Sequence, residues 1–375
     1  MKQIIIHITL PDKFPTGGPR TLFDLVSNLD KNRYRSIVIY PSGKFSDQLS
    51  NYCQVSNHSI KKYPNIKNLC YLIKLLKQNS KAIIHFHHSN TLWLASIIKV
   101  IKRNKIIYTE HVLTKDYNPP NKMSYLIYTI KYAINIKAVD KIICVSKAVK
   151  SYIEKRFHIK NTKLAIIHNG IIIPKLTFSK KTNQDSTFNI TCVGALNWVK
   201  NYSDLVEIIN LLVNKYSTTN IQLTIFGDGP QRKNIESKIQ EYNLHNNILL
   251  KGHVSLEEIH ENLKFCDLYL QTSISESFGL GILDALSYGI PVLAYDVGAI
   301  NELVTEKCGI LIPFYPESQK RIDEFALAIK TILQDNKLRA NFSRACIEKS
   351  NDYAFEKIIP QYIELINNIL IPISK

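Results

Sequence analysis

A segment in the C-terminal half of the chain combines two carboxylates with a glycine-rich turn. Glu276 precedes the sequence Phe-Gly-Leu-Gly at 278–281, and Asp284 follows that turn by three residues. The spacing predicts a helix that begins at the glycines. Backbone N–H groups at a helix start lack intrahelical partners and lie at the positive end of the helix dipole, so they can bind a diphosphate. Carboxylates accept hydrogen bonds from hydroxyl groups, and the combination therefore indicates a site for a nucleotide-sugar.

Further glycine turns are expected at strand ends in the same half of the chain, at Gly194, at 227–229 and at Gly252. Glycine lets a ligand approach the backbone closely. Lys200 follows the first of these turns and could pair with a phosphate as a point charge. Each turn by itself is a weak indication, because tight strand-to-helix turns need glycine for backbone reasons alone. Their order along the chain strengthens the prediction of a ligand site.

Apolar runs with strand character alternate along the chain with segments whose apolar residues recur at helical spacing. The runs lie at 4–8, 36–40, 82–86, 105–109, 141–145, 189–193, 222–226, 247–250, 268–271 and 291–295. This alternation predicts parallel sheets covered by helices, with ligands beyond the carboxyl ends of the strands. We expect two Rossmann-like α/β domains facing each other across a cleft, residues 1–173 and 188–351. The polar segment 174–187 is expected to be the linker between them.

Charge is divided unevenly between the two halves. Residues 1–186 contain 31 Lys and Arg against 9 Asp and Glu, whereas residues 187–375 contain 17 against 22. A basic half attracts anionic lipid headgroups, nucleic acid or acidic substrates, and each basic residue near an anionic membrane contributes about 1 kcal/mol. Nothing in the chain resembles a nucleic-acid-binding module, so nucleic acid is not expected as a partner. An ordinary lysine-rich surface remains an alternative to a membrane role.

Two helical segments of the basic half, 66–78 and 123–138, interleave Lys with Leu, Ile and Tyr. Such a composition suits a helix lying on an anionic bilayer. An amphipathic helix packed on its own sheet explains either segment at least as well. Sequence therefore leaves association with an anionic membrane surface as a hypothesis.

The chain lacks the marks of export or membrane spanning. No apolar run reaches the ~18 residues of a membrane-spanning helix, and the first residues lack a signal-peptide cleavage site. The seven cysteines are scattered, with no C-x-x-C pair, which favours a reducing compartment. We expect a cytoplasmic protein, with peripheral association at the inner face of the cytoplasmic membrane as the hypothesis to test.

Taken in order, the motifs of the C-terminal half resemble family 4 of the retaining glycosyltransferases, which have the GT-B fold. The matching stretches are V-G-x-L-x-x-x-K-N at 193–201, F-G-D-G-P at 226–230, K-G-H-V at 251–254, E-S-F-G-x-x-x-x-D-A at 276–285 and G-I-P-V-L-A-Y-D-V-G-A-x-x-E at 289–302. No single stretch is specific, but their order and spacing together are. The resemblance also implies that the apolar segment 352–375 forms a helix that crosses back to the first domain.

The resemblance implies roles for individual residues. Lys200 would bind the donor diphosphate, Glu276 would contact the transferred sugar, and Asp284 would hold the ribose hydroxyls. The backbone at 252–254 would meet the base, and the amides at 279–281 would support phosphate or sugar. The full donor-binding set that it implies is Gly17, Gly18, Gly194, Gly252, His253, Val254, Ser277, Phe278, Gly279, Leu280, Gly281 and Asp284.

Two positions depart from the family pattern. Asp284 stands where the family usually has Glu, so the carboxylate is one methylene shorter. Ala195 stands where the family often has Arg, which removes a bidentate phosphate donor. Either Lys200 acts with a cation from elsewhere, such as Arg20, or donor binding is weak. A catalytically degenerate protein that still binds nucleotide-sugar is the corresponding alternative.

The first half of the chain offers fewer chemical signals. Gly17 and Gly18 follow the first strand, where the family has a glycine loop facing the donor phosphates, although a plain glycine loop explains them equally well. His111 ends a strand at the position of the family's functional histidine, and we expect it in the substrate site. His85 and His87 alternate on one strand face and would allow metal binding. No third ligand at suitable spacing is evident, so no metal is expected.

We expect transfer of a sugar from a nucleoside-diphosphate sugar to an acceptor hydroxyl, with retention of configuration, no cofactor and no metal. Lys200 and backbone dipoles would stabilise the leaving diphosphate. A lipid-linked or envelope-bound glycan is the acceptor suggested by the basic first half. A nicotinamide-dependent oxidoreductase is disfavoured because the fingerprint G-x-G-x-x-G is absent. A sugar-nucleotide epimerase of the same fold remains the alternative enzyme.

Overall fold

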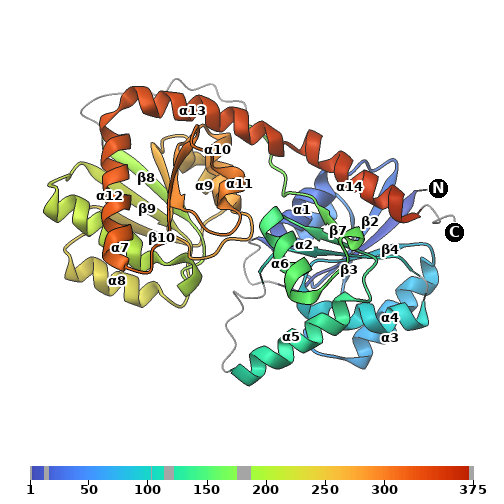
Figure 1. The fold of residues 1–375 in the computed structure, drawn as a ribbon. Coiled ribbons are helices and arrows are strands. Elements are labelled where there is room, and N and C mark those ends of the chain that lie inside the picture. Colours follow the sequence, from blue (N-terminus) through green and yellow to red (C-terminus); the bar gives the residue numbers. More distant parts are fainter. Residues whose placement is uncertain (1, 12–16, 103, 114–121, 175–186, 371–375) are drawn as a thin grey trace. The chain divides into compact units, whose positions relative to one another are not determined.

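A computed structural model describes residues 2–11, 17–102, 104–113, 122–174 and 187–370 of the 375-residue chain. It divides into two compact units (Figure 1). The N-terminal unit comprises Met1–Gly170 together with Phe355–Lys375, and the C-terminal unit comprises Ile171–Ala354. Residues 175–186 of the expected linker lie outside the described residues. The last helix therefore belongs to the N-terminal unit, although 184 residues separate it in sequence from the rest of that unit.

The N-terminal unit is built on a parallel sheet with the strand order β3-β2-β1-β4-β5-β6-β7 in the described residues. Its strands are β1 Gln3–Ile8, β2 Tyr34–Tyr40, β3 Gln54–Asn57, β4 Ile83–Phe86, β5 Ile106–Glu110, β6 Lys141–Cys144 and β7 Leu164–Ile166. Its helices are α1 Gly18–Asn28, α2 Lys44–Ser50, α3 Ile66–Gln78, α4 Trp93–Ile101, α5 Lys122–Ile136, α6 Lys147–Phe157 and α14 Phe355–Leu370. Sequence pattern did not predict β3 and β7, because these edge strands are short and β3 is polar.

Isoleucine-rich strands explain the central part of this sheet. Strands covered by helices on both faces are apolar at consecutive positions rather than at alternate ones. In β1, β4 and β5 most side chains are buried. One face of the sheet packs against α14 through a cluster that includes Ile5, Ile83, Ile107, Ile358 and Ile366. The predicted return of the C-terminal segment to the first domain is thereby confirmed.

The C-terminal unit contains a second parallel sheet, with the order β10-β9-β8-β11-β12-β13. Its strands are β8 Phe188–Val193, β9 Ile221–Phe226, β10 Ile248–Gly252, β11 Leu268–Gln271, β12 Val292–Tyr295 and β13 Gly309–Ile312. Its helices are α7 Tyr202–Asn210, α8 Arg232–Glu241, α9 Leu256–Leu263, α10 Leu280–Ser287, α11 Ile300–Leu303, α12 Ser318–Gln334 and α13 Asn336–Ser350. The expected α/β class with two Rossmann-like domains is confirmed.

Strand order in the C-terminal sheet identifies where a ligand should bind. From β8 the chain proceeds outward through β9 to β10, and it then returns to place β11 on the other side of β8. Loops that leave β8 and β11 consequently diverge at their carboxyl ends. In open α/β sheets this switch point is the usual ligand site.

Candidate active site

An ion pair between Lys200 and Glu276 lies at the switch point of the C-terminal sheet. Lys200 ends the short 3₁₀ turn Trp198–Lys200 after β8, and Glu276 lies in the loop after β11. The lysine Nζ is 2.5 Å from Oε2 of the glutamate. Both side chains are largely but not fully buried. The two residues that sequence assigned to diphosphate and sugar are therefore brought into direct contact.

Backbone hydrogen bonds hold the two loops together. The amide of Ile274 donates to the carbonyl of Val199 at 2.8 Å. The hydroxyl of Thr272 donates to the carbonyl of Lys200 at 3.2 Å. Asn197 caps the 3₁₀ turn, because its side-chain oxygen accepts from the amide of Lys200 at 3.1 Å. The position of the ion pair thus follows from main-chain structure and not only from flexible side chains.

Two polar residues that sequence analysis did not assign also bind Glu276. The amide of Gln271 donates to Oε2 of Glu276 at 3.3 Å and to the hydroxyl of Ser273 at 2.6 Å. The Ser273 hydroxyl lies 3.5 Å from the same carboxylate oxygen. Gln271 ends β11, five residues before Glu276, and a polar residue at the end of an apolar strand was the signal available in the sequence. These partners hold the carboxylate in one orientation.

The turn after β12 fixes the backbone of Glu276. The amide of Ala299 donates to the carbonyl of Glu276 at 2.9 Å. Gly298 has a φ of 59°, and a Cβ added there would clash with the same carbonyl and lie 2.9 Å from the Glu276 nitrogen. Only glycine permits this close approach at a positive φ. The G-I-P-V-L-A-Y-D-V-G motif therefore contributes to the site through Gly298.

Helix α10 begins beside Glu276, as the glycine turn predicted. Gly279 is the N-cap with a φ of 102°, and its carbonyl accepts the first helical hydrogen bond, from the amide of Leu283 at 3.0 Å. The amides of residues 280–282 precede that bond and have the position of an anion-binding helix start. A Cβ on Gly279 would lie 3.6 Å from Cγ of Glu276. Carboxylate, lysine and helix start are therefore close neighbours.

Three residues of the predicted donor-binding set have packing roles. A Cβ on Gly281 would clash with the hydroxyl of Tyr269, so close packing alone requires glycine there. The buried ring of Phe278 packs edge-on against Tyr353, with 5.8 Å between ring centroids. Ser277 is also buried. Donor contacts from these positions stay a prediction, and for Phe278 they would have to come from the backbone.

The glycine turns at the ends of β8 and β9 pack against each other. A Cβ on Gly227 would clash with the carbonyl of Gly194, and one on Gly229 would lie 2.6 Å from the carbonyl of Leu196. A Cβ on Gly194 would lie 3.4 Å from Cε of Lys200. The methylene chain of Lys200 therefore runs over a backbone segment that has no side chain in the way.

Asp284 lies in α10 and is 2% exposed. Its Oδ1 is 3.6 Å from Nε2 of His260 in α9. That separation allows a charge interaction but is too long for a good hydrogen bond. The predicted contact with ribose hydroxyls stays a prediction. His260 is a neighbour of this carboxylate that sequence analysis did not identify.

At the end of β10, Gly252 has a φ of 71°, and His253 is exposed beside half-buried Val254. A Cβ on Gly252 would lie 3.4 Å from Nη1 of Arg232. Arg232 pairs with Glu236 at 2.8 Å and lies 3.7 Å from a carboxylate oxygen of Asp228. The predicted base-binding strand end thus has an arginine beside it. In the N-terminal unit, Arg20 lies 3.7 Å from a carboxylate oxygen of Asp24.

His111 and the glycine loop of the N-terminal unit are adjacent. Gly17 is the N-cap of α1 with a φ of 55°. A Cβ on Gly18 would lie 3.6 Å from Cδ2 of His111. Burial lowers the pKa of His111 to about 4, with a further contribution from His88. His111 is therefore neutral near pH 7, and a neutral imidazole can both donate and accept a hydrogen bond.

His7, His85 and His87 form a buried cluster on β1 and β4, so the expectation that His85 and His87 have no third histidine partner was wrong. Potential ligand atoms of the three lie within 4.8 Å of one another. The missing member comes from β1, which pairs with β4, and sequence spacing alone cannot reveal such a neighbour.

Hydrogen bonds within the cluster account for its order. Nδ1 of His7 is 3.1 Å from Nε2 of His87, and Nε2 of His85 is 2.7 Å from the Thr109 hydroxyl. Burial lowers the pKa of all three, to about 3 for His7. The cluster is neutral and offers no carboxylate to offset a cation. The absence of a metal remains an expectation.

Glu110 is a buried carboxylate next to His111 that sequence analysis did not assign. The hydroxyl of Tyr132 in α5 donates to Oε2, and the amide of Val112 donates to Oε1 at 3.2 Å. Burial raises the pKa of Glu110 to about 7, against the lowering effect of these hydrogen bonds. The contact ties α5 to the end of β5.

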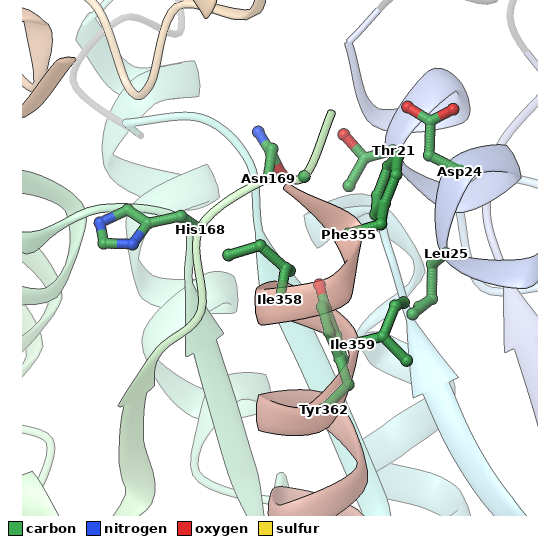
Figure 2. A pocket seen from close by; sticks show the side chains of 10 residues that line it. Thr21, Asp24, Leu25, His168, Asn169, Phe355, Ile358, Ile359 and Tyr362 are labelled. Carbon is green, nitrogen blue, oxygen red and sulfur yellow. The ribbon is translucent and has the colours of Figure 1, made fainter. Parts of the chain in front are cut away.

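A small pocket of the N-terminal unit lies between α1, the turn at 168–170 and α14 (Figure 2). Thr21 and Asp24 line it from α1, and Phe355 and Tyr362 line it from α14. Its volume of about 10 Å³ is at the lower limit for one water molecule. The pocket is therefore too small for a sugar. Gly170 is required there, because a Cβ would clash with the ring of Phe355.

Two protein families match the chain in succession. The Glycosyltransferase Family 4 model matches residues 15–173, and the Glycosyl transferases group 1 model matches residues 175–349. Together they cover both units. The chain belongs to the family 4 glycosyltransferases. Lys200, Glu276 and the start of α10 lie in the second matched region, and His111 and the glycine loop lie in the first.

Relatives of this glycosyltransferase include an Escherichia coli enzyme named UDP-Gal:alpha-D-GlcNAc-diphosphoundecaprenol alpha-1,3-galactosyltransferase. It is 25% identical over 357 residues, which is 89% of each chain. Among solved structures, a glycosyltransferase from Rickettsia africae is similar with a TM-score of 0.79 and 18% identity, covering 99% of both chains. Anabaena HepE, solved with UDP and glucose, has a TM-score of 0.77 and 18% identity, covering 98% of this chain and all of the other. These structures establish the GT-B fold.

Proposed function

We propose that the enzyme transfers a sugar from a nucleoside-diphosphate sugar, with retention of configuration, to a hydroxyl of a lipid-linked or cell-envelope glycan. The contact of Lys200 with Glu276 beside the start of α10 carries the proposal, because it joins a phosphate-binding cation, a hydroxyl acceptor and an anion-binding helix start. The E. coli relative, named for transfer from UDP-galactose to a diphosphoundecaprenol-linked sugar, supports this acceptor class.

Lys200 acts on the leaving diphosphate. As the bond to the anomeric carbon breaks, negative charge grows on the diphosphate and the sugar becomes oxocarbenium-like. A fixed cation and the amides at 280–282 stabilise the developing charge more than they stabilise the ground state. These groups, rather than a metal ion, offset the diphosphate charge in this proposal.

Glu276 orients the sugar in the donor. Gln271 and Ser273 hold its carboxylate, which can accept from sugar hydroxyls while retaining its ion pair. When the donor binds, its phosphate oxygens compete with Glu276 for the Lys200 ammonium. Neutral His111 contributes a hydrogen bond from the N-terminal unit. No covalent nucleophile is assigned.

Where the enzyme works follows from its proposed acceptor. We place it at the inner face of the cytoplasmic membrane, where the basic first half of the chain meets anionic headgroups. Charge supports this placement, since residues 1–186 carry 31 basic against 9 acidic side chains. The free cysteines fit a reducing compartment.

Donor identity can be tested by measuring unfolding temperature with a panel of UDP-, GDP- and ADP-sugars. A ligand that binds only the folded protein raises its apparent stability. A UDP-sugar is expected to give the largest shift and then to be consumed when a polyprenyl-diphosphate sugar is supplied. A Lys200→Ala variant should show no shift. Stabilisation of both proteins by the same donor, or consumption of donor without any acceptor, would contradict the proposal.

A further inference from the structure

Helix α5 carries an apolar stripe that no other part of the described structure covers. Five of its large apolar side chains are 45–63% exposed: Met123, Leu126, Ile127, Ile130 and Ile134. At 100° per residue they lie within about 100° of the helix circumference. The buried residues, Tyr132 and Ile136, lie on the opposite side. One face of α5 therefore packs on the domain while the other is apolar and in solvent.

Its counterpart in the sequence, α3, behaves in the opposite way. Both helices interleave Lys with Leu, Ile and Tyr. In α3, Leu72 and Leu76 are fully buried, and Leu69, Ile73 and Leu75 are partly buried. The expectation that each helix covers its own sheet is confirmed for α3. It is wrong for the outer face of α5, and a contiguous exposed apolar patch of this kind marks an interaction surface.

Helix α4 extends this surface. It packs beside α5, where the Ser96 hydroxyl donates to the side chain of Asn135 at 2.7 Å (Figure 1). Val100 and Ile101 at its end are also exposed. The patch thus involves two adjacent helices and is not confined to a single turn.

Charge around the patch selects its partner. Exposed Lys122, Lys131 and Lys137 border the stripe, and residues 58–139 contain 14 Lys and Arg against 2 Asp and Glu. Two copies of such a surface would repel each other, which disfavours self-association through α5. An anionic bilayer satisfies both features, since headgroups attract the lysines and the acyl boundary accepts the apolar stripe.

We propose that α5 is a membrane-docking helix that lies parallel to an anionic lipid surface with its apolar stripe in the bilayer interface. With 15 residues it extends about 22 Å and is too short to span the hydrocarbon core. Among the described residues no helix has the length and apolarity to cross a membrane. Tyr132, on the packed side of α5, binds Glu110 beside His111. Docking therefore fixes this end of the N-terminal sheet relative to the lipid surface.

Full-length protein tested by co-sedimentation with phosphatidylglycerol-containing vesicles, and with phosphatidylcholine vesicles alone, examines the proposal directly. Wild type should bind the anionic vesicles at least tenfold more tightly. Ile130→Gln/Ile134→Gln should weaken that binding at least tenfold without changing the unfolding temperature. The control Phe265→Gln/Leu327→Gln replaces similarly exposed side chains of the C-terminal unit, 68% and 59% exposed, and should bind like wild type.

The lysines are tested in the same way with Lys131→Gln/Lys137→Gln, whose control is Lys233→Gln/Lys337→Gln in the C-terminal unit. Only the first pair should reduce binding and its sensitivity to salt. Equal loss in the apolar pair and its control, or binding unaffected by the α5 changes, would overturn the proposal. A concentration-dependent dimer that the α5 substitutions dissociate would overturn it too, by assigning the patch to a second copy.

The inference draws on the proposed function only for the idea that the acceptor is lipid-linked. Vesicle binding requires neither donor nor acceptor. An enzyme that binds vesicles through α5 but transfers no sugar would refute the proposed reaction alone, and one that transfers sugar but ignores vesicles would refute the docking helix alone.

Discussion

The ammonium of Lys200 and the carboxylate of Glu276 are 2.5 Å apart, on loops that leave neighbouring strands of one sheet. Each group neutralises the other before any substrate binds. Substrate binding therefore has to exchange this ion pair for contacts with phosphate and sugar, and both residues are held for that exchange by the main chain around them.

Replacing Lys200 by Ala should lower kcat/KM at least 100-fold, because the leaving diphosphate loses its cation. Loss of one preorganised charge-stabilising group costs about 3 kcal/mol in the transition state. Steady-state transfer kinetics measure the effect. The control is Lys264→Ala, which breaks an exposed ion pair with Glu261 and should leave kcat/KM unchanged. Similar losses in both variants would show that the effect is general rather than local.

Glu276→Gln should separate charge from hydrogen bonding. The amide keeps an oxygen for Gln271 and Ser273 but cannot pair with Lys200. We expect KM for the donor to change little, since Lys200 is freed for phosphate, while kcat falls at least tenfold because the sugar is misoriented. A variant with unchanged kcat would remove Glu276 from the catalytic role.

Gly298→Ala should displace Glu276. The added methyl would clash with the Glu276 carbonyl and would also occupy a positive φ, so we expect a loss of roughly 2 kcal/mol or more in the free energy of unfolding together with reduced activity. Gly43→Ala is the control, because Gly43 also has a positive φ but has no atom within 4 Å of the added Cβ. Denaturant unfolding of the two variants should differ clearly.

Glu110→Gln should change how stability depends on pH. Burial raises the pKa of Glu110 from 4.5 to about 7, so between these values the folded state holds a proton that the unfolded state has released. The free energy of unfolding then decreases as pH rises through this window. The variant, which keeps an acceptor for Tyr132, should be more stable at pH 8 by up to about 3 kcal/mol and equally stable at pH 4. Parallel pH profiles for both proteins would contradict this.

The buried histidines should make the protein sensitive to acid in the opposite sense. Burial lowers the pKa of His7 from 6.5 to about 3, so between these values the unfolded state binds a proton that the folded state excludes. The free energy of unfolding therefore falls as pH drops from 6.5 towards 3. His7→Gln should flatten this dependence by a few kcal/mol, as urea unfolding at several pH values would reveal. His158→Gln, at an exposed position, serves as the control.

The sequence by itself determined the α/β class, the strand-end glycine turns and the residues of the C-terminal motifs. Apolar strand runs, and the glycine that begins α10, are local signals, because backbone conformation depends on a residue and its near neighbours. Gly279 at the start of α10 and the return of the last helix were both predicted correctly.

Contacts between distant segments were decided only by the tertiary structure. His7 joins His85 because two strands pair, and Gly298 supports Glu276 because a turn 22 residues further along the chain packs against its backbone. The stripes of α3 and α5 look alike in sequence, yet one is covered and the other exposed. Periodicity shows that a helix has an apolar face, whereas what covers that face depends on packing between segments far apart in the chain.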